Sequence, residues 1–402
     1  MLPEGDPAPL DGSLPERAQV EIAHRALGLY VHVPFCITRC GYCDFNTYTA
    51  AELGSRPGAS RAGYVEVAIA ELDLAAQVLG PGAPPVSTVF VGGGTPTVLP
   101  AEDLGRLVTA IERRFGLAAD AEVTTESNPE SVSAGDLARL RETGFNRISF
   151  GMQSAVPAVL ATLDRVHSPG RPAQAVAEAR AAGFSQVSLD LIYGTPGETV
   201  ADWETSLAAA LATRPDHLSA YALVVEPGTR LAARIRRGEL PMTDEDDLAD
   251  KYLLAEDSLT AAGYFAYEVS NWATAAAGRC RHNLGYWRGD HWWGIGPGAH
   301  SHVGGVRWWN VKHPNAYAGC LDSGASPAYA REVLTTEQRR NERVLLELRL
   351  HEGLPVQVLT RTERMRMPDL IGRKLADLDG ERLVLTVRGR LLADGVVRDL
   401  LD

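Results

Sequence analysis

Three cysteine residues with a regular spacing lie near the start of the chain. Cys36, Cys40 and Cys43 follow the pattern C-x3-C-x2-C. The apolar run 29–33 precedes them and is stopped by Pro34, which predicts a buried strand that leads into a loop. Three thiolates can hold a [4Fe–4S] cluster and leave one iron with an open coordination position. The spacing therefore predicts an iron–sulfur cluster that can bind a further ligand.

Two other interpretations of the cysteine loop stay open at this point. Structural zinc is held by four tetrahedral nitrogen or sulfur ligands. Only His32 or the distant Cys280 and Cys320 would complete such a set. The three thiols would otherwise be unrelated buried side chains, although their close spacing favours the cluster.

A glycine-rich segment follows the next apolar run. Gly92, Gly93 and Gly94 precede Thr95, and three successive residues without a Cβ atom let a ligand approach the backbone closely. A tight turn that needs a positive φ angle is the alternative explanation.

Charged and polar residues follow three later apolar runs. Glu126 ends the third predicted strand, Gln153 follows the fourth, and Asp190 lies in the fifth. Arg165 carries a planar guanidinium that fits a carboxylate. Glu126 would otherwise cap the next helix, and Arg165 and Asp190 would otherwise neutralise each other, because buried charges are costly unless they are paired.

The segment His282-Asn283-Leu284-Gly285-Tyr286-Trp287 combines an imidazole with two aromatic rings. A neutral imidazole is a good axial ligand for heme iron, and the rings would pack on a porphyrin. His291, His300, His302 and Cys280 are alternative ligands nearby. A hydrogen-bonded core histidine is the other interpretation of His282.

Strands and helices alternate through the first half of the chain. Apolar strands alternate with helices of 3.6-residue periodicity, which predicts an α/β fold with a parallel sheet covered on its outer face. The predicted helices are 101–115, 134–143, 170–183 and 200–213, and the strands after the glycine-rich segment are 122–127, 147–152, 186–192 and 217–225. Ligands of such sheets gather at the carboxyl ends of the strands.

Composition excludes several classes of function. The formal net charge is −12, from 39 basic and 51 acidic residues, and no long basic run predicts binding to nucleic acid. No apolar run approaches the roughly 20 residues that cross a bilayer, so we expect at most a transient membrane association. The N-terminus lacks the apolar core of a secretory signal, and the clustered cysteines suit a reducing compartment. We therefore expect a cytoplasmic protein.

Together these motifs resemble the radical S-adenosylmethionine (SAM) superfamily. The resemblance implies a partial (β/α)6 barrel, a [4Fe–4S] cluster on the three cysteines and SAM on the open iron. It also implies that the GGGTP element cradles the SAM amino group and that Glu126 binds the ribose hydroxyls. The remaining residues that it places around SAM are Tyr30, Tyr42, Gln153, Arg165 and Asp190.

Within this superfamily the chain resembles the oxygen-independent coproporphyrinogen III dehydrogenases and the related heme chaperones. The dehydrogenases carry a fourth cysteine where this chain has Phe45. The segment 282–287 matches the H-N-x-x-Y-W element of the chaperones, which implies heme binding by His282, Asn283, Tyr286 and Trp287. The resemblance thus implies a chaperone that passes heme to an acceptor hemoprotein. The alternative function is the oxidative decarboxylation of coproporphyrinogen III. A third interpretation is that the protein is a radical enzyme that acts on another substrate.

The expected domain organisation has four parts. Residues 1–22 lack periodicity and predict a mobile tail, and residues 23–240 form the radical SAM barrel. Residues 241–330 form a linker that contains the heme-binding region. Residues 331–402 predict helices 337–351 and 367–377, a hairpin around 383–386 and a last helix from about 391. This set resembles a winged-helix domain, and without a basic face it predicts a lid or a protein contact.

Overall fold

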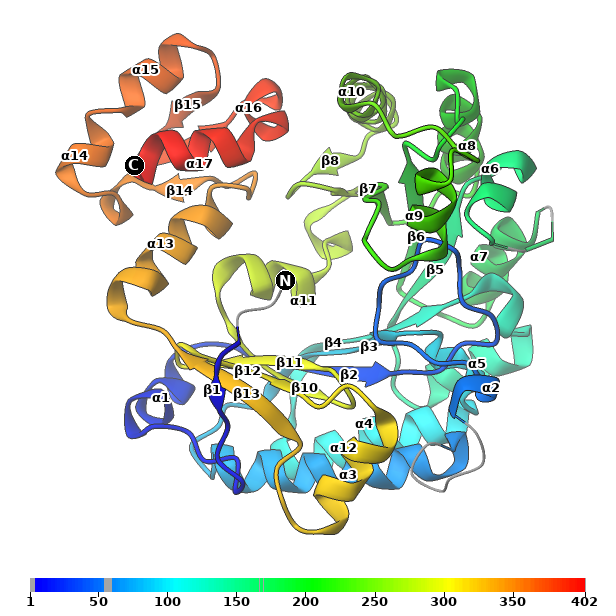
Figure 1. Cartoon of the computed structure of the whole chain (residues 1–402), viewed down its shortest axis with the longest axis vertical. Helices are drawn as coiled ribbons and strands as arrows, with labels where there is room; N and C mark the ends of the chain where they lie inside the picture. Colours follow the sequence, from blue (N-terminus) through cyan, green and yellow to red (C-terminus); the bar gives the residue numbers. More distant parts are fainter. Residues whose placement is uncertain (1–3, 54–59, 166, 169, 402) are drawn as a thin grey trace.

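Six parallel strands in consecutive order form the centre of the molecule (Figure 1). The structure is a computed structural model that describes residues 4–53, 60–165, 167–168 and 170–401. The predicted α/β fold with an open parallel sheet is confirmed. The six strands are β2 (Leu27–Val33), β3 (Val86–Gly93), β4 (Leu117–Ser127), β5 (Arg147–Gln153), β6 (Gln186–Tyr193) and β7 (His217–Ala222).

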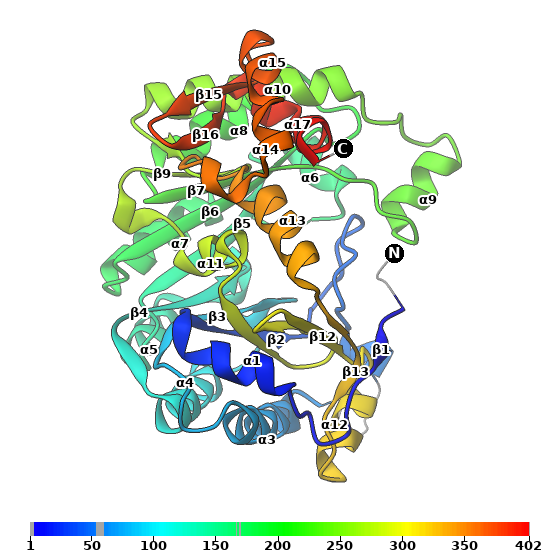
Figure 2. The same cartoon turned by 90° about the vertical axis from the view of Figure 1, so that its left-hand side faces the viewer.

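Helices cover the outer face of these strands, as Figure 2 shows for α3, α4, α5 and α7. In α4 the side chains of Leu104, Leu107 and Ile111 are fully buried, because their helical spacing places them on one face. Capping boxes at Ser133 and Thr199 fix the starts of α5 and α8. The helices of this layer are α3 (Arg61–Leu79), α4 (Ala101–Phe115), α5 (Ala134–Glu142), α6 (Pro157–Thr162), α7 (Arg171–Ala181) and α8 (Val200–Ala212).

The sheet continues past both edges of the six-stranded set, beside β2 and beside β7. Residues 241–330, which we expected to form a linker, supply most of these added strands. Strand β10 pairs with β2 in parallel, and β11 to β13 follow it in antiparallel order. The elements of this region are α9 (Arg230–Arg236), α10 (Glu245–Ala261), β8 (Phe265–Ala266), β9 (Asn271–Ala273), α11 (Arg281–Arg288), β10 (His291–Ile295), β11 (His300–Val303), β12 (Val306–Asn310), α12 (Pro314–Asp322) and β13 (Ala328–Val333). Apolar and polar residues do not alternate simply along these strands, because aromatic rings occupy both faces of the sheet. Trp293 packs on Trp308 in the core, whereas Trp292 lines a cavity.

The N-terminal segment is part of the fold, which corrects the expected tail. Strand β1 (Asp6–Pro7) pairs with β13, and α1 (Glu16–Glu21) buries Ala18 against the Gly304 turn. The partner of β1 lies more than 300 residues away, so no local pattern indicates this pairing. Residues 1–3 of the predicted tail lie outside the described residues. The short helix α2 (Ala50–Leu53) follows the cysteine loop.

The C-terminal residues form a unit with a core of their own (Figure 1). Its three strands have the order β14-β16-β15. The helix predicted near 367–377 ends at Gly372, because residues 376–379 form a strand of the small sheet. The elements are α13 (Thr336–Glu347), β14 (Leu354–Pro355), α14 (Arg361–Arg364), α15 (Met367–Gly372), β15 (Ala376–Asp379), β16 (Arg382–Leu385), α16 (Val387–Leu391) and α17 (Ala393–Leu401).

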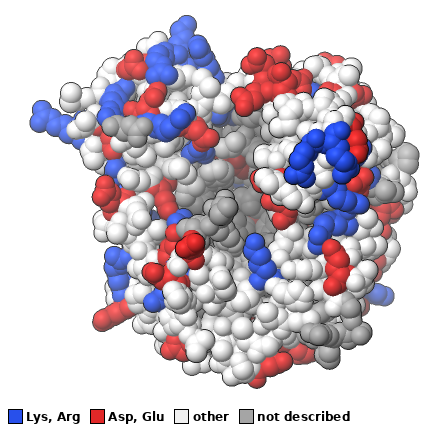
Figure 3. All heavy atoms as spheres, viewed as in Figure 1, with Lys and Arg blue, Asp and Glu red and all other residues white. Residues whose placement is uncertain are grey.

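The surface mixes acidic and basic side chains (Figure 3). Basic residues gather over α9, where Arg230, Arg234 and Arg237 form ion pairs with neighbouring carboxylates. Among the helices of the described residues, none has the length and apolar character needed to cross a membrane.

Candidate functional site

A cavity of about 380 Å³ lies at the carboxyl ends of the parallel strands. A volume in this range is typical of cofactor and small-ligand sites. The predicted residues that line it are Cys36, Cys40, Tyr42, Cys43, Gly93, Gly94, Thr95, Glu126, Gln153, Arg165 and Asp190. Tyr30 is the exception: its hydroxyl bonds His32 Nδ1 at 2.9 Å, and its ring lines a neighbouring cavity. The fold therefore brings almost the whole predicted cluster and SAM set together.

The cysteine loop is fixed by backbone hydrogen bonds. The N–H of Cys36 donates to the Tyr48 carbonyl at 3.0 Å, and the N–H of Gly41 donates to the Leu163 carbonyl at 3.0 Å. Burial raises the pKa of the Cys36 and Cys43 thiols, so their thiolates need a nearby positive charge. Within the described ranges, no three His, Cys, Asp or Glu side chains lie close enough to hold one metal ion. Three thiolates can hold a [4Fe–4S] cluster, whereas structural zinc needs four nitrogen or sulfur ligands.

The glycine-rich turn after β3 packs directly against the cysteine loop. A Cβ atom on Gly94 would lie 2.5 Å from the Phe35 carbonyl oxygen and 3.1 Å from Cys36 Sγ, so only glycine fits there. The N–H groups of Gly94 and Thr95 donate to the Val33 and Phe35 carbonyls at 2.9 and 2.8 Å. These N–H groups are therefore engaged within the protein, and the turn serves first to bring β3 against the loop.

Glu126 and Asp190 place two partly buried carboxyl groups in the cavity. Burial, together with the charge of Asp190, raises the pKa of Glu126 to about 8, although the Gly93 N–H donates to Glu126 at 3.1 Å. Burial also raises the pKa of Asp190, which accepts hydrogen bonds from Ser149 at 2.8 Å and Ser219 at 2.7 Å. Such a pair favours a ligand that brings positive charge into the cavity.

Arg165 does not form the ion pair with Asp190 that we considered from the sequence. Its guanidinium donates to the Gly151 carbonyl at 2.8 Å and lies 3.8 Å from Cys40 Sγ. The buried Nε atom of Arg165 has no hydrogen-bond partner among the described residues. Gln153, beside it, has a φ angle of 65°, which is unusual for a residue other than glycine and is typical of functional sites. An unpartnered buried donor in this cavity fits an anionic group of a ligand.

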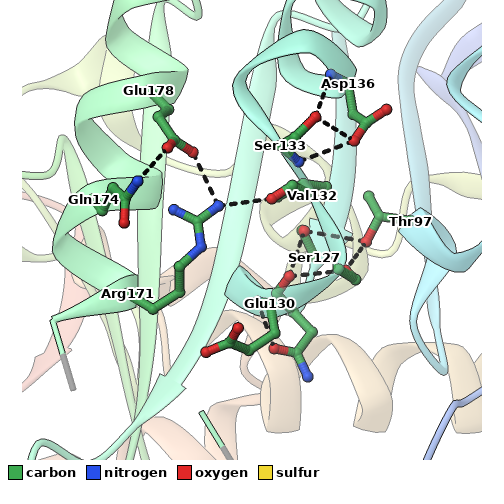
Figure 4. A network of polar contacts seen from close by, with 11 residues as sticks. Thr97, Ser127, Glu130, Val132, Ser133, Asp136, Arg171, Gln174 and Glu178 are labelled. Carbon is green, nitrogen blue, oxygen red and sulfur yellow. Dashed lines mark hydrogen bonds and ion pairs between the residues drawn. The ribbon is translucent and has the colours of Figure 1, made fainter. Parts of the chain in front are cut away.

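A network of hydroxyl and carboxylate groups fixes the ends of β3 and β4 (Figure 4). Thr97 bonds Ser127 at 3.1 Å and Ser131 at 2.5 Å. Beside this network, Arg171 donates to the Val132 carbonyl at 2.7 Å and pairs with Glu178 at 2.9 Å. These contacts hold the glycine-rich turn and the Glu126 strand in fixed relative positions.

Polar side chains on three neighbouring strands complete the inner face of the cavity, and our sequence analysis missed most of them. They alternate with buried apolar residues and are Arg147, Ser149, Ser188, Asp190, His217 and Ser219. The register places Ser149 beside Ser188 and Asp190 beside Ser219. The period of two, repeated in three strands, is the sequence signal that would have identified this set.

His282 lies in the core, with both ring nitrogens engaged. Nδ1 lies 2.8 Å from the Thr88 hydroxyl, and Nε2 lies 2.8 Å from the Tyr286 hydroxyl. Burial lowers the pKa of His282 to about 3, so the ring is neutral. Ligation of heme iron by His282 would require the loss of one of these bonds, so the geometry favours the alternative of a hydrogen-bonded core histidine.

The other residues of the H-N-x-x-Y-W segment point to different surroundings. Asn283 lines the cavity of the cysteines, and Tyr286 lines the neighbouring cavity. Trp287 packs on a small apolar cluster that contains Tyr267 and Leu350. The segment therefore does not form one binding surface.

Comparison with known proteins places this geometry in a family. The model of the radical SAM superfamily matches residues 30–210, which include the cysteine loop and the first five strands of the parallel set. This superfamily implies a [4Fe–4S] cluster and SAM as cofactors. A heme chaperone HemW from Mycobacterium tuberculosis is 55% identical over 374 residues, which are 93% of this chain and 94% of that protein. The chain belongs to the HemW family.

More distant relatives agree with this assignment. The HemW of Bacillus subtilis is 33% identical over 91% of this chain and 97% of its own length. The solved structure of the coproporphyrinogen III oxidase HemN from Escherichia coli matches with a TM-score of 0.81 at 24% identity. It covers 96% of this chain and 92% of the HemN chain, so HemN and this HemW family member share their fold.

Proposed function

We propose that the protein is a heme chaperone that binds heme and transfers it to an acceptor hemoprotein. The observation that carries this proposal is the 55% identity with a HemW heme chaperone over 93% of the chain. The match spans 93% of this chain and 94% of the relative. The acceptor remains unidentified, and a cytoplasmic location with at most transient membrane contact remains a prediction.

The first cavity would hold the cluster and SAM. Cys36, Cys40 and Cys43 would ligate three irons, and Arg165 would hold the SAM carboxylate. When bound, the cluster and SAM supply one-electron chemistry, and the chain positions them and shields them from water. Glu126 and Asp190 would favour the positive charges of SAM through their partly buried carboxyl groups.

Heme would bind close to this cavity. Tyr286 lines a second cavity, and Phe45, Gly93 and Glu126 line both cavities. Aromatic walls suit a flat apolar macrocycle. Of the four residues implied by the H-N-x-x-Y-W resemblance, we keep Tyr286 as a contact of heme and Asn283 as a residue between the two cofactor sites. His282 and Trp287 would support them from the core.

Coproporphyrinogen III decarboxylation is the second candidate function, because the fold is shared with HemN. Phe45 stands at the position of the fourth cysteine, is 64% exposed and lines the cluster cavity. A phenyl ring cannot act as a thiol, which favours the chaperone.

One sample distinguishes the two functions. The protein would be reconstituted with iron and sulfide under anaerobic conditions, incubated with coproporphyrinogen III, SAM and a reductant, and titrated with hemin. We expect hemin uptake and no protoporphyrinogen. Multiple turnovers to protoporphyrinogen would replace the chaperone with the dehydrogenase, and neither product nor uptake would reject both.

A further inference from the structure

The second cavity has a volume of about 740 Å³ and lies between the β10–β12 strands and helix α13. Its walls are the rings of Tyr30 on β2, Trp292 on β10 and Tyr286 on α11, and the side chains of Leu345 and Leu346 on α13. A cavity of this size with apolar and aromatic walls is typical of a cofactor site. Its composition therefore fits a flat, largely apolar ligand.

The sheet presents two histidines and an arginine on one face of this cavity. His300 and His302 lie two residues apart on β11, so their side chains share a face. His302 is paired in register with Trp292 on β10 and with Arg307 on β12. All four side chains line the cavity.

His302 has the hydrogen-bond arrangement of a metal-ligating histidine. Its Nδ1 lies 3.1 Å from the carbonyl oxygen of Asp290, and a carbonyl only accepts, so Nδ1 carries the proton. Nε2 then has a lone pair and makes no hydrogen bond within the described part of the chain. Ligating histidines commonly donate their other ring N–H to a carbonyl in this way. Burial lowers the pKa of His302 to about 4, so the ring is neutral and its lone pair is available.

The other histidines of the region lack this arrangement. His32 uses Nδ1 for Tyr30 and Nε2 for the Asn46 carbonyl, both at 2.9 Å. His291 uses Nε2 for the Glu21 carbonyl and Nδ1 for the Gly304 N–H. His300 is exposed and stacks on Trp309 with ring centroids 6.0 Å apart, and no described hydrogen bond orients its ring.

We propose that heme binds in this second cavity with Nε2 of His302 as the axial ligand of its iron. The proposal deepens the proposed function and rests on it. Arg307 would form an ion pair with a heme propionate. It would then give up its 2.7 Å ion pair with Glu342 on α13. Because Phe45 and Glu126 line both cavities, the heme edge would lie beside the cluster and SAM site.

Hemin titration of the full-length protein tests the ligand. His302→Ala should weaken hemin binding at least about tenfold, which corresponds to about 1.4 kcal/mol, and should shift the Soret band. Added imidazole should restore the band. His302→Met should keep a ligand and give a Soret band distinct from those of the wild type and of His302→Ala, which a merely misfolded variant would not give. His351→Ala removes an exposed histidine of the C-terminal unit and serves as the control.

The results separate this inference from the function on which it rests. If His302→Ala keeps the wild-type affinity and Soret band, the ligand assignment is overturned; a loss confined to His300→Ala or His282→Ala would overturn it as well. A wild-type protein that takes up no hemin would reject the chaperone function, and the heme site with it.

Discussion

At the scale of single residues, Glu126 is a carboxyl group of the first cavity whose charge changes close to neutral pH. Burial and Asp190 raise its pKa to about 8, so the free carboxyl group is largely protonated at neutral pH. SAM carries positive charge and binds the ionised form better. Wild-type affinity for SAM should therefore increase as the pH rises through 8.

The variant Glu126→Gln isolates this effect. Its SAM affinity should fall below that of the wild type by up to about tenfold at pH 8.5, and the difference should shrink toward pH 6.5. Calorimetric titration of the reconstituted protein at both pH values measures it. Glu112→Gln, on an exposed position of α4, should match the wild type. If the SAM affinities of Glu126→Gln and the wild type differed by the same factor at both pH values, the raised pKa of Glu126 would not explain the difference.

The five cysteines provide a matched test of the cluster ligands. Cys36, Cys40 and Cys43 share one loop and one cavity; Cys280 lines the same cavity but bonds Glu122 at 3.6 Å, and Cys320 is not among the lining residues. Replacement of the three loop cysteines by alanine should reduce bound iron and sulfide to background after anaerobic reconstitution, because Cys280 alone cannot supply the three thiolates that hold a cluster. Replacement of Cys280 and Cys320 should leave the iron and sulfide content unchanged. Full iron content in the triple variant would exclude the assigned ligands.

At the scale of secondary-structure elements, local patterns predicted the fold where contacts are local. Helix α4 occupies the predicted residues 101–115, because its apolar side chains recur at helical spacing. Strand β10 was missed, because its pairing with β2 joins segments more than 250 residues apart and its aromatic residues face both sides. Non-local pairing leaves little trace in a single sequence.

The same distinction applies to the candidate site. The cysteine loop and the glycine-rich turn are contiguous motifs, so the sequence identified them directly. The unpaired nitrogen of His302 depends on the Asp290 carbonyl and on the path of β11, which no local pattern contains. His282 was the more conspicuous histidine in the sequence, yet both of its nitrogens are engaged.

Glu71 shows how such distant contacts join elements. Its carboxyl group accepts hydrogen bonds from the Gly296 N–H at 2.7 Å, the Tyr317 hydroxyl at 2.5 Å and Asn310 at 2.7 Å. It thereby connects α3 with the loop after β10, with β12 and with α12. Burial raises the pKa of Glu71 to about 7 from an ordinary value of 4.5, despite these bonds.

This raised pKa predicts a pH dependence of stability. Between pH 4.5 and 7 the native state holds a proton on Glu71 that the unfolded state releases, so the free energy of unfolding falls as the pH rises. In urea melts, Glu71→Gln should be less stable than the wild type by about 1–3 kcal/mol at pH 5.5, because a buried acceptor is lost. The difference should narrow by pH 8. Glu204→Gln, on an exposed position of α8, is the control, and a difference that widens with pH would contradict the assignment.

At the scale of the whole molecule, the second cavity depends on how the C-terminal unit sits on the sheet. Leu345 and Leu346 of α13 form one wall, while the opposite wall belongs to the large sheet. The unit has its own core, and Arg390 of α16 pairs with Glu256 of α10 at 2.6 Å, with both side chains largely buried. Removal of one partner of such a pair leaves a buried charge without compensation.

Arg390→Gln should therefore loosen the C-terminal unit without unfolding the barrel. Amide hydrogen exchange should become faster in residues 336–401 and remain unchanged in β2 to β7, since the two cores are separate. Hemin affinity should fall by about threefold to tenfold, because a mobile α13 holds the cavity wall less firmly. Arg373→Gln is the matched control, since its ion pairs with Asp369 and Asp399 stay within the C-terminal unit. Unchanged hemin affinity despite faster exchange would mean that heme binding does not use the α13 wall, and it would move the heme site away from this cavity.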